Sequence, residues 1–157
     1  MLKHLLAPMA VLALSACGSG EKSTTIGGAT YSSNDRDGTA SITTDKGSLT
    51  TAEGAAAANF QMPAFAPKYP GATIVGVIRS ESDGTTRHMV NMQSTDSIGK
   101  VAAFYKDGFV RAGLKTTSEM MTADGGMMSA EGDGRKVSIA ISQDEGKTAA
   151  IVTYSGD

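Results

Sequence analysis

STDSIGKVAAFYKDGFVRAGL, residues 94–114, is the one segment beyond the N-terminal leader whose apolar residues keep a helical period. At about 100° per residue, these apolar residues fall on one stripe of a helix. The stripe consists of Ile98, Val101, Ala102, Tyr105, Phe109 and Ala112. We therefore predict an amphipathic helix that packs this stripe, including Tyr105 and Phe109, against a sheet.

Both ends of the helix carry recognisable signals. Residues 94–97 (STDS) offer side-chain oxygens that can accept hydrogen bonds from the first-turn amides. At the other end, Gly113 suits a left-handed residue that stops the helix, and Leu114 supplies the apolar contact that often follows it.

The segment before the helix has the pattern of a β-hairpin. Residues 73–79 (TIVGVIR) and 86–93 (TRHMVNMQ) are rich in β-formers, and Ser82-Asp83-Gly84 lies between them. We expect two antiparallel strands that lead into the helix.

Turn signals after the helix allow strand registers to be predicted. A three-residue loop at 123–125 (ADG) would place Met121 opposite Met127 and Met120 opposite Met128. Met120 and Met128 would then face the core, and Met121 and Met127 would point away from it.

A two-residue loop at Asp133-Gly134 would pair Glu131 with Lys136, Ala130 with Val137 and Met128 with Ile139. A further loop at 144–146 (DEG) precedes a last strand over residues 148–154. Two inward faces remain possible for that strand: Ala149 with Ile151, or Ala150 with Val152 and Tyr154.

Together these elements predict a two-layer α+β domain over residues 60–157, with an antiparallel sheet of about six strands (hairpin, helix, four-stranded meander) and one helix across one face. Residues 17–59 are mostly Gly, Ser, Thr and Ala, and we expect a flexible polar tether there. Within that tether, a marginal hairpin around residues 39–51 remains possible.

Residues 1–16 have the layout of an export signal. Lys3 and His4 form a short basic start, and the apolar run over residues 5–14 is too short to span a bilayer. The exit Leu14-Ser15-Ala16-Cys17 resembles the lipobox of bacterial lipoproteins. The resemblance implies cleavage before Cys17, lipidation of its thiol and a membrane anchor. The absence of Asp at position 18 implies, by the same resemblance, the periplasmic face of an outer membrane.

The charge of the mature chain excludes some partners. Lys3 is the only charged residue of the leader, so 13 basic and 16 acidic residues remain, a formal charge of −3. No segment is markedly basic. We therefore expect no nucleic acid partner.

The sequence offers little for catalysis. The mature chain has one histidine, His88, on a strand with Val90 and Met92, where we expect it at the rim of the core. Cys17 would be consumed by the lipid, and most acidic residues fall in turns. We expect no catalytic residue and no cofactor, although an enzyme or an accessory subunit with a site that sequence does not display stays an alternative.

Methionine is the unusual component, with seven residues outside the leader. Thioethers are soft ligands for Cu(I), so a metal site would use Met121, Met127 and His88. Methionine also fills gaps in cores poor in aromatic residues, and we expect packing rather than metal binding here.

Residues 66–155 resemble a group of small exported bacterial domains. The resemblance rests on Tyr69-Pro70-Gly71-Ala72, Thr95-Asp96-Ser97 and Phe104-Tyr105-Lys106, which are structural rather than catalytic motifs. It implies a fold and no activity. Elimination and the predicted anchor favour a non-catalytic binding or envelope-structural module with a protein partner in the envelope.

Overall fold

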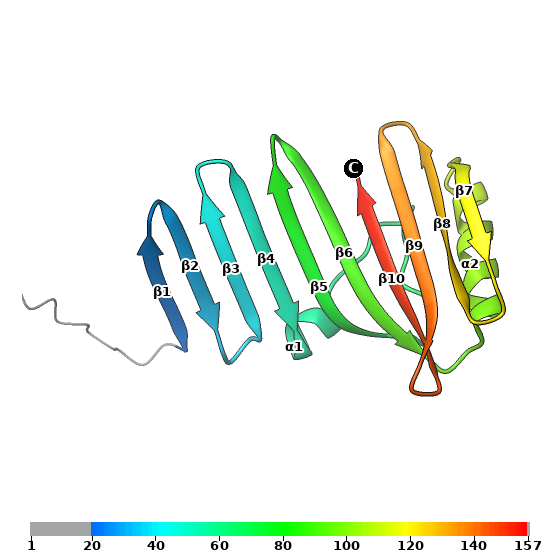
Figure 1. The fold of residues 1–157 in the computed structure, drawn as a ribbon, viewed down its shortest axis with the longest axis horizontal. Coiled ribbons are helices and arrows are strands. Elements are labelled where there is room, and N and C mark those ends of the chain that lie inside the picture. The colour runs from blue at the N-terminus through cyan, green and yellow to red at the C-terminus, as the bar shows by residue number, and fades with distance from the viewer. Residues whose placement is uncertain (1–19, 157) are drawn as a thin grey trace, which may run out of the picture.

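The computed structural model describes residues 20–156. Its strands form one antiparallel sheet in the spatial order β1-β2-β3-β4-β5-β6-β10-β9-β8-β7 (Figure 1). The helices are α1 (Gly54–Ala58) and α2 (Ile98–Arg111). The strands are β1 (Glu21–Ile26), β2 (Ala29–Asn34), β3 (Thr39–Thr44), β4 (Gly47–Glu53), β5 (Thr73–Ser82), β6 (Thr85–Ser94), β7 (Lys115–Met121), β8 (Gly125–Gly132), β9 (Arg135–Asp144) and β10 (Lys147–Ser155).

The predicted fold class, a two-layer α+β domain with about six strands, is wrong. The described residues form a single ten-stranded sheet and are mostly β, with one five-residue and one 14-residue helix. The prediction failed because β1 to β4 come from the segment whose composition suggested a tether. A strand ladder is held by backbone hydrogen bonds, so Ser- and Thr-rich runs can join it without filling a core.

Residues 21–53 are therefore not the flexible tether that we expected over residues 17–59. The hairpin that the sequence left open around residues 39–51 is formed by β3 and β4. Strand β4 also pairs with β5, with Thr51 opposite Ile78, so the sheet continues without a break across residue 60.

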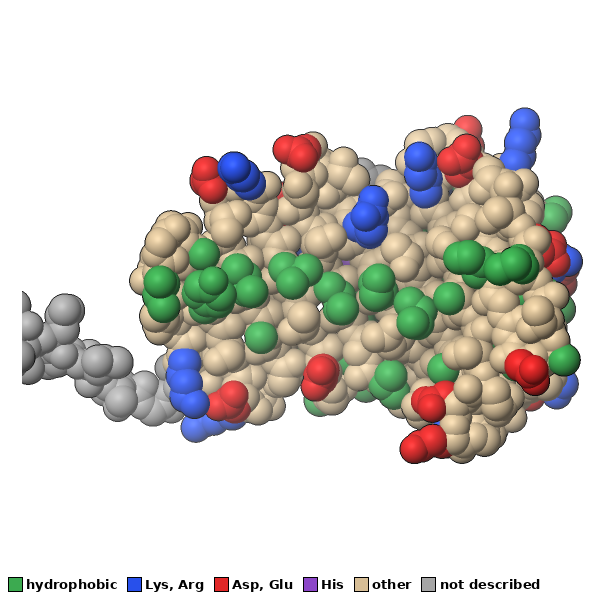
Figure 2. All heavy atoms as spheres, viewed as in Figure 1, with side chains coloured by type: hydrophobic (Ala, Val, Ile, Leu, Met, Phe, Trp, Pro, Cys, Tyr) green, Lys and Arg blue, Asp and Glu red, His purple; other side chains and the backbone are tan. Residues whose placement is uncertain are grey.

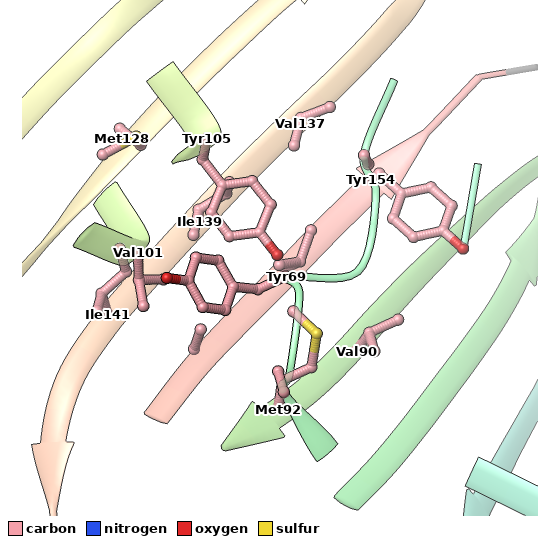
Figure 3. Packing of buried hydrophobic residues seen from close by; sticks show 14 of the residues in the cluster. Tyr69, Val90, Met92, Val101, Tyr105, Met128, Val137, Ile139, Ile141 and Tyr154 are labelled. Atoms are coloured by element: carbon pink, nitrogen blue, oxygen red, sulfur yellow. The ribbon is translucent and has the colours of Figure 1, made fainter. Parts of the chain in front are cut away.

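The predicted apolar stripe of α2 is confirmed. Tyr105 and Phe109 are 1% and 2% exposed and pack against one face of the sheet. Figure 3 shows Tyr105 reaching from α2 into the buried cluster, beside Tyr69. The sheet supplies Val90, Met92, Met128, Val137, Ile139, Ile141 and Val152 to this core.

The C-terminal stop of α2 is also confirmed. Gly113 has φ 71°, and the Leu114 amide donates to the Phe109 carbonyl at 2.9 Å. The Gly113 amide donates to Val110 at 3.1 Å, which completes a Schellman motif.

The start of α2 is fixed mainly through Asp96. No side-chain bond caps the helix at Ser97. The Tyr69 hydroxyl donates to one Asp96 carboxylate oxygen at 2.8 Å, and Lys100 donates to the other at 3.0 Å. Hydrogen bonds from Lys100 and then Tyr69 hold the pKa of Asp96 below its usual value. The buried Thr148 hydroxyl donates to the Asp96 carbonyl at 2.6 Å, which ties the helix start to β10.

One predicted register is confirmed and the other is wrong. Strands β8 and β9 pair as expected, with Ala130 opposite Val137. Strands β7 and β8 are shifted by one residue, because Gly125 lies in the strand and Met120, not Met121, faces Met127. The shift exchanges the two faces: Met120 is 67% exposed, and Met121 is packed against the core.

The last strand directs Thr148, Ala150, Val152 and Tyr154 inward. This settles the choice that the sequence left open. Strand β10 lies between β6 and β9, so Tyr154 is directly opposite His88 on one side and Val137 on the other.

Candidate functional site

A groove of about 1110 Å³ lies at the ends of β5, β6 and β10. One wall is formed by the segment that follows α1. The lining residues are Phe60, Gln61, Met62, Pro63, Phe65, Arg79, Gly84, Thr85, Thr86, Arg87, His88, Gly134, Lys136, Tyr154, Ser155 and Gly156. Its size suits a drug-sized or lipid-like small molecule.

Aromatic rings form a continuous row in this groove. The rings of His88 and Tyr154 are stacked, with centroids 4.9 Å apart and planes 18° apart. Phe60 approaches His88 at 5.7 Å, and Phe65 meets Tyr154 edge to face at 5.9 Å. Figure 3 shows Tyr154 at the margin of the buried cluster, with its hydroxyl turned away from it. The row is therefore an apolar surface with a polar edge.

The wall segment is held in place at two points. The Arg135 guanidinium lies 5.6 Å from the centre of the Phe65 ring, and it donates to the Ala112 carbonyl at 3.3 Å. The Tyr105 hydroxyl donates to the Pro67 carbonyl at 3.1 Å. Helix α2 thereby positions the segment that forms the groove wall.

One basic residue, Arg79, lies on the same sheet face as the aromatic row. Of the basic residues that border the groove, Arg79 is on the His88 face of the sheet, whereas Arg87 and Lys136 are in register with the opposite face. None of the described lining residues is Asp or Glu. Arg79 also contacts Glu81 at 3.3 Å, but both side chains are about half exposed, so this pair is weak. Arg79 therefore provides a positive charge on the His88 face of the groove.

His88 lies on β6 directly opposite Arg79 of β5. Burial, followed by the Arg79 charge, lowers the pKa of His88 below its usual value of 6.5. The imidazole is therefore neutral at pH 7 and offers one donor and one acceptor. Burial also raises the pKa of Tyr154 to about 12, so its hydroxyl keeps its proton.

The lining offers several kinds of group that can contact a ligand. The lining contains hydroxyls and His88, and none of its residues within the described range 20–156 is a carboxylate that could orient the imidazole as a general base. Its components are apolar contact, positive charge and neutral hydrogen-bonding groups.

The structure does not bring Met121, Met127 and His88 together. Met127 is on β8 and His88 is on β6, with β9 and β10 between them. His88 shares the helix-side face with Val90, as expected, whereas Met127 lies on the opposite face of the sheet. The three side chains therefore cannot share one Cu(I) ion. Within residues 20–156 there is no cluster of three or more His, Cys, Asp or Glu residues that could hold a metal ion.

Cys17 and the predicted leader lie outside the described residues. Across the part of the chain that the structure describes, neither helix is both long and apolar enough to cross a membrane.

Sequence reasoning placed His88 at the rim of the core but missed its partners. Phe60 and Tyr154 are distant in sequence and meet His88 only because β10 inserts beside β6. Arg79 had a local signal, since it lies opposite His88 in the hairpin that the Asp83-Gly84 turn sets.

A family model described as START domain-like matches residues 74–147, just under half of the chain. The match begins in β5 and ends at the first residue of β10. It includes Arg79, His88 and Lys136 of the groove but neither the Phe60 wall nor Tyr154. The comparison with curated proteins found no match. The comparison with solved structures likewise found none.

Proposed function

We propose that this chain is a binding module whose groove takes an amphipathic anion. The apolar part of the ligand lies along Phe60, His88 and Tyr154, and its anionic group lies near Arg79. The observation that carries this proposal is the aromatic row with Arg79 on the same face and no Asp or Glu among the described lining residues.

The family match supports a binding role, because START-like domains are typically ligand-binding domains. A groove of about 1110 Å³ is large enough for a single-chain amphiphile. Neutral His88 adds hydrogen bonding without placing a second positive charge beside Arg79 at pH 7.

Fluorescence titration with 11-(dansylamino)undecanoic acid tests the proposal. This probe has a long apolar chain and a carboxylate. Residues 17–157 carrying Cys17→Ser keep every described residue and avoid lipidation. We expect saturable binding by the wild type. Arg79→Gln and His88→Ala should each raise the dissociation constant about tenfold, which is a loss of about 1.4 kcal/mol in binding free energy.

Two controls separate the groove from other apolar surface. Met120→Ser changes an exposed side chain on the opposite face, and it should leave the affinity unchanged. The methyl ester of the probe lacks the negative charge and should bind wild type and Arg79→Gln equally. Unchanged carboxylate affinity in both groove variants would refute the site.

The pH dependence has a defined sign. Because the pKa of His88 is lowered, the imidazole gains its proton only as the pH falls below 6.5. The added positive charge should raise the affinity for the carboxylate probe as the pH is lowered from 7 to below 6.5. His88→Ala should remove this rise in affinity.

We also propose that Cys17 carries the lipid anchor and holds the module at the periplasmic face of an outer membrane, within reach of an envelope protein partner. The support is the lipobox-like sequence, Leu14 to Cys17. Because β1 begins at Glu21, only three residues separate Cys17 from this strand, which would keep β1 close to the bilayer.

Mass spectrometry of the protein from membranes tests the anchor. Wild type should carry two or three acyl chains on a mature N-terminal cysteine and should partition into detergent. Cys17→Ser should lack the added mass. An acylated Cys17→Ser protein would contradict this proposal.

A further inference from the structure

The sheet face opposite α1 and α2, here called the open face, carries a band of exposed hydrophobic side chains. Figure 2 shows this band crossing the molecule from β1 to the C-terminal strands. Its large members are 37% to 67% exposed. They are Ile26, Tyr31, Ile42, Leu49, Met89, Ile151, Met127 and Met120, here called the apolar band.

Strand register makes the apolar band continuous. Tyr31, Ile42 and Leu49 are direct cross-strand neighbours on β2, β3 and β4. Met89 pairs with Ile78, which is the diagonal neighbour of Leu49. A second row then runs over Ile151, Ala140, Met127 and Met120 on β10, β9, β8 and β7. Neighbours at these spacings touch, so the band is one surface.

In strands β1 to β4, the large apolar side chains lie on only one face of the sheet. Neither helix covers the open face of these strands within the described residues (Figure 1). Their large apolar residues nevertheless all lie on the open face. The helix-side face carries Glu21, Ser23, Thr25, Thr30, Ser32, Asn34, Thr39, Ser41, Thr43, Ser48, Thr50 and Ala52.

Such alternation is typical of strands with one buried face. In β1 to β4 the apolar face is on the side opposite the core under α2, so these strands do not extend that core. The apolar band therefore requires a cover of its own.

We propose that the cover is a second copy of this chain, packed open face to open face as a two-layer sandwich. A straight apolar band is complementary to itself under a two-fold axis along it or across it, as an isologous interface requires. Nine strand spacings of about 4.8 Å give a length of about 43 Å. A width of about 15 Å would bury roughly 650 Å² per copy, near the approximately 800 Å² of a standard interface.

The charges beside the apolar band can pair between two copies of the chain. Both signs occur on the open face: Glu131 lies 3.8 Å from Lys136, and Asp144 is paired in register with Lys147. Mixed signs can pair across a two-fold axis.

Sedimentation equilibrium of residues 17–157 carrying Cys17→Ser tests the dimer. We expect a dimer mass in the micromolar range. Ile151→Lys and Met127→Lys place a charge in the apolar band and should each weaken dimerisation at least tenfold. Val110→Lys changes a residue that is 78% exposed on α2, away from the open face, and should leave the dimer unchanged. Circular dichroism verifies that each variant is folded.

Methionine oxidation provides a second measurement on the unmodified surface. Hydrogen peroxide should oxidise Met89 and Met127 more slowly as protein concentration rises, and Ile151→Lys should remove this protection. A monomeric wild type at high micromolar concentration would overturn the proposal, as would a dimer that both Lys variants leave intact. A monomer that binds phosphatidylglycerol vesicles through Ile151 and Met127 would overturn it in favour of a lipid surface.

Discussion

Tyr105→Ala should lower the free energy of unfolding by about 3–5 kcal/mol, which is the range for truncating a large buried aromatic residue. Tyr105 is 1% exposed at the centre of the core between α2 and the sheet. Its hydroxyl also donates to the Pro67 carbonyl at 3.1 Å. The substitution removes ring packing and the hydrogen bond together, and urea unfolding followed by circular dichroism measures the loss.

Two further variants separate these contributions. Tyr105→Phe keeps the ring and leaves the Pro67 carbonyl without its donor, so we expect a loss of about 1–3 kcal/mol. Val110→Ala, on the exposed side of the same helix, should cost at most about 0.5 kcal/mol. A Tyr105→Ala loss as small as that of Val110→Ala would show that the α2 stripe does not carry the core.

Gly126→Ala should lower the free energy of unfolding by about 1–3 kcal/mol, which is the usual cost of overpacking a well-packed site. The loss should arise at the β7 edge of the sheet. A Cβ atom at Gly126 would lie 2.7 Å from the Met121 sulfur and 2.8 Å from the Met121 Cα, and it would also meet the Met120 carbonyl oxygen. Strand β7 would have to move away from β8. Faster amide hydrogen exchange in β7, together with a lower urea midpoint, measures that movement.

Gly99→Ala is the matched control. Nothing lies within 4 Å of a Cβ atom at Gly99, which is in the first turn of α2. Ala is the better helix former, so this variant should gain about 0.5–1 kcal/mol. Destabilisation by Gly99→Ala and none by Gly126→Ala would contradict the packing described for these two positions.

The sequence predicted elements whose signals are local. The α2 stripe followed from a 3.6-residue period, and its C-terminal stop followed from Gly113 and Leu114. The β8–β9 register followed from the two-residue Asp133-Gly134 turn, in which both residues have positive φ.

The β7–β8 register was not predictable from the same reasoning. Gly125 looked like a loop residue, but it is the first residue of β8 and pairs with Ser142 of β9. A shift of one residue exchanges strand faces, and it moved Met121 toward the core and Met120 outward.

Strands β1 to β4 were missed because a composition poor in large apolar residues suggests a segment without ordered structure. These strands add only Ala52 to the margin of the core, and backbone pairing holds them in the sheet. Thr and Ser at alternate positions suit a sheet whose face meets water. The groove was missed for a different reason. It depends on β10 lying beside β6, a non-local pairing that brings Tyr154 to His88 and that no local signal specified.

We propose above that the aromatic row of the groove receives the apolar part of an amphipathic anion. The most direct measurement is an isotope-filtered nuclear Overhauser experiment on the protein saturated with 11-(dansylamino)undecanoic acid. We expect cross-peaks from the probe chain to ring protons of Phe60, His88 and Tyr154. Cross-peaks confined to the methyl groups of Met120 and Met127 on the open face would contradict it.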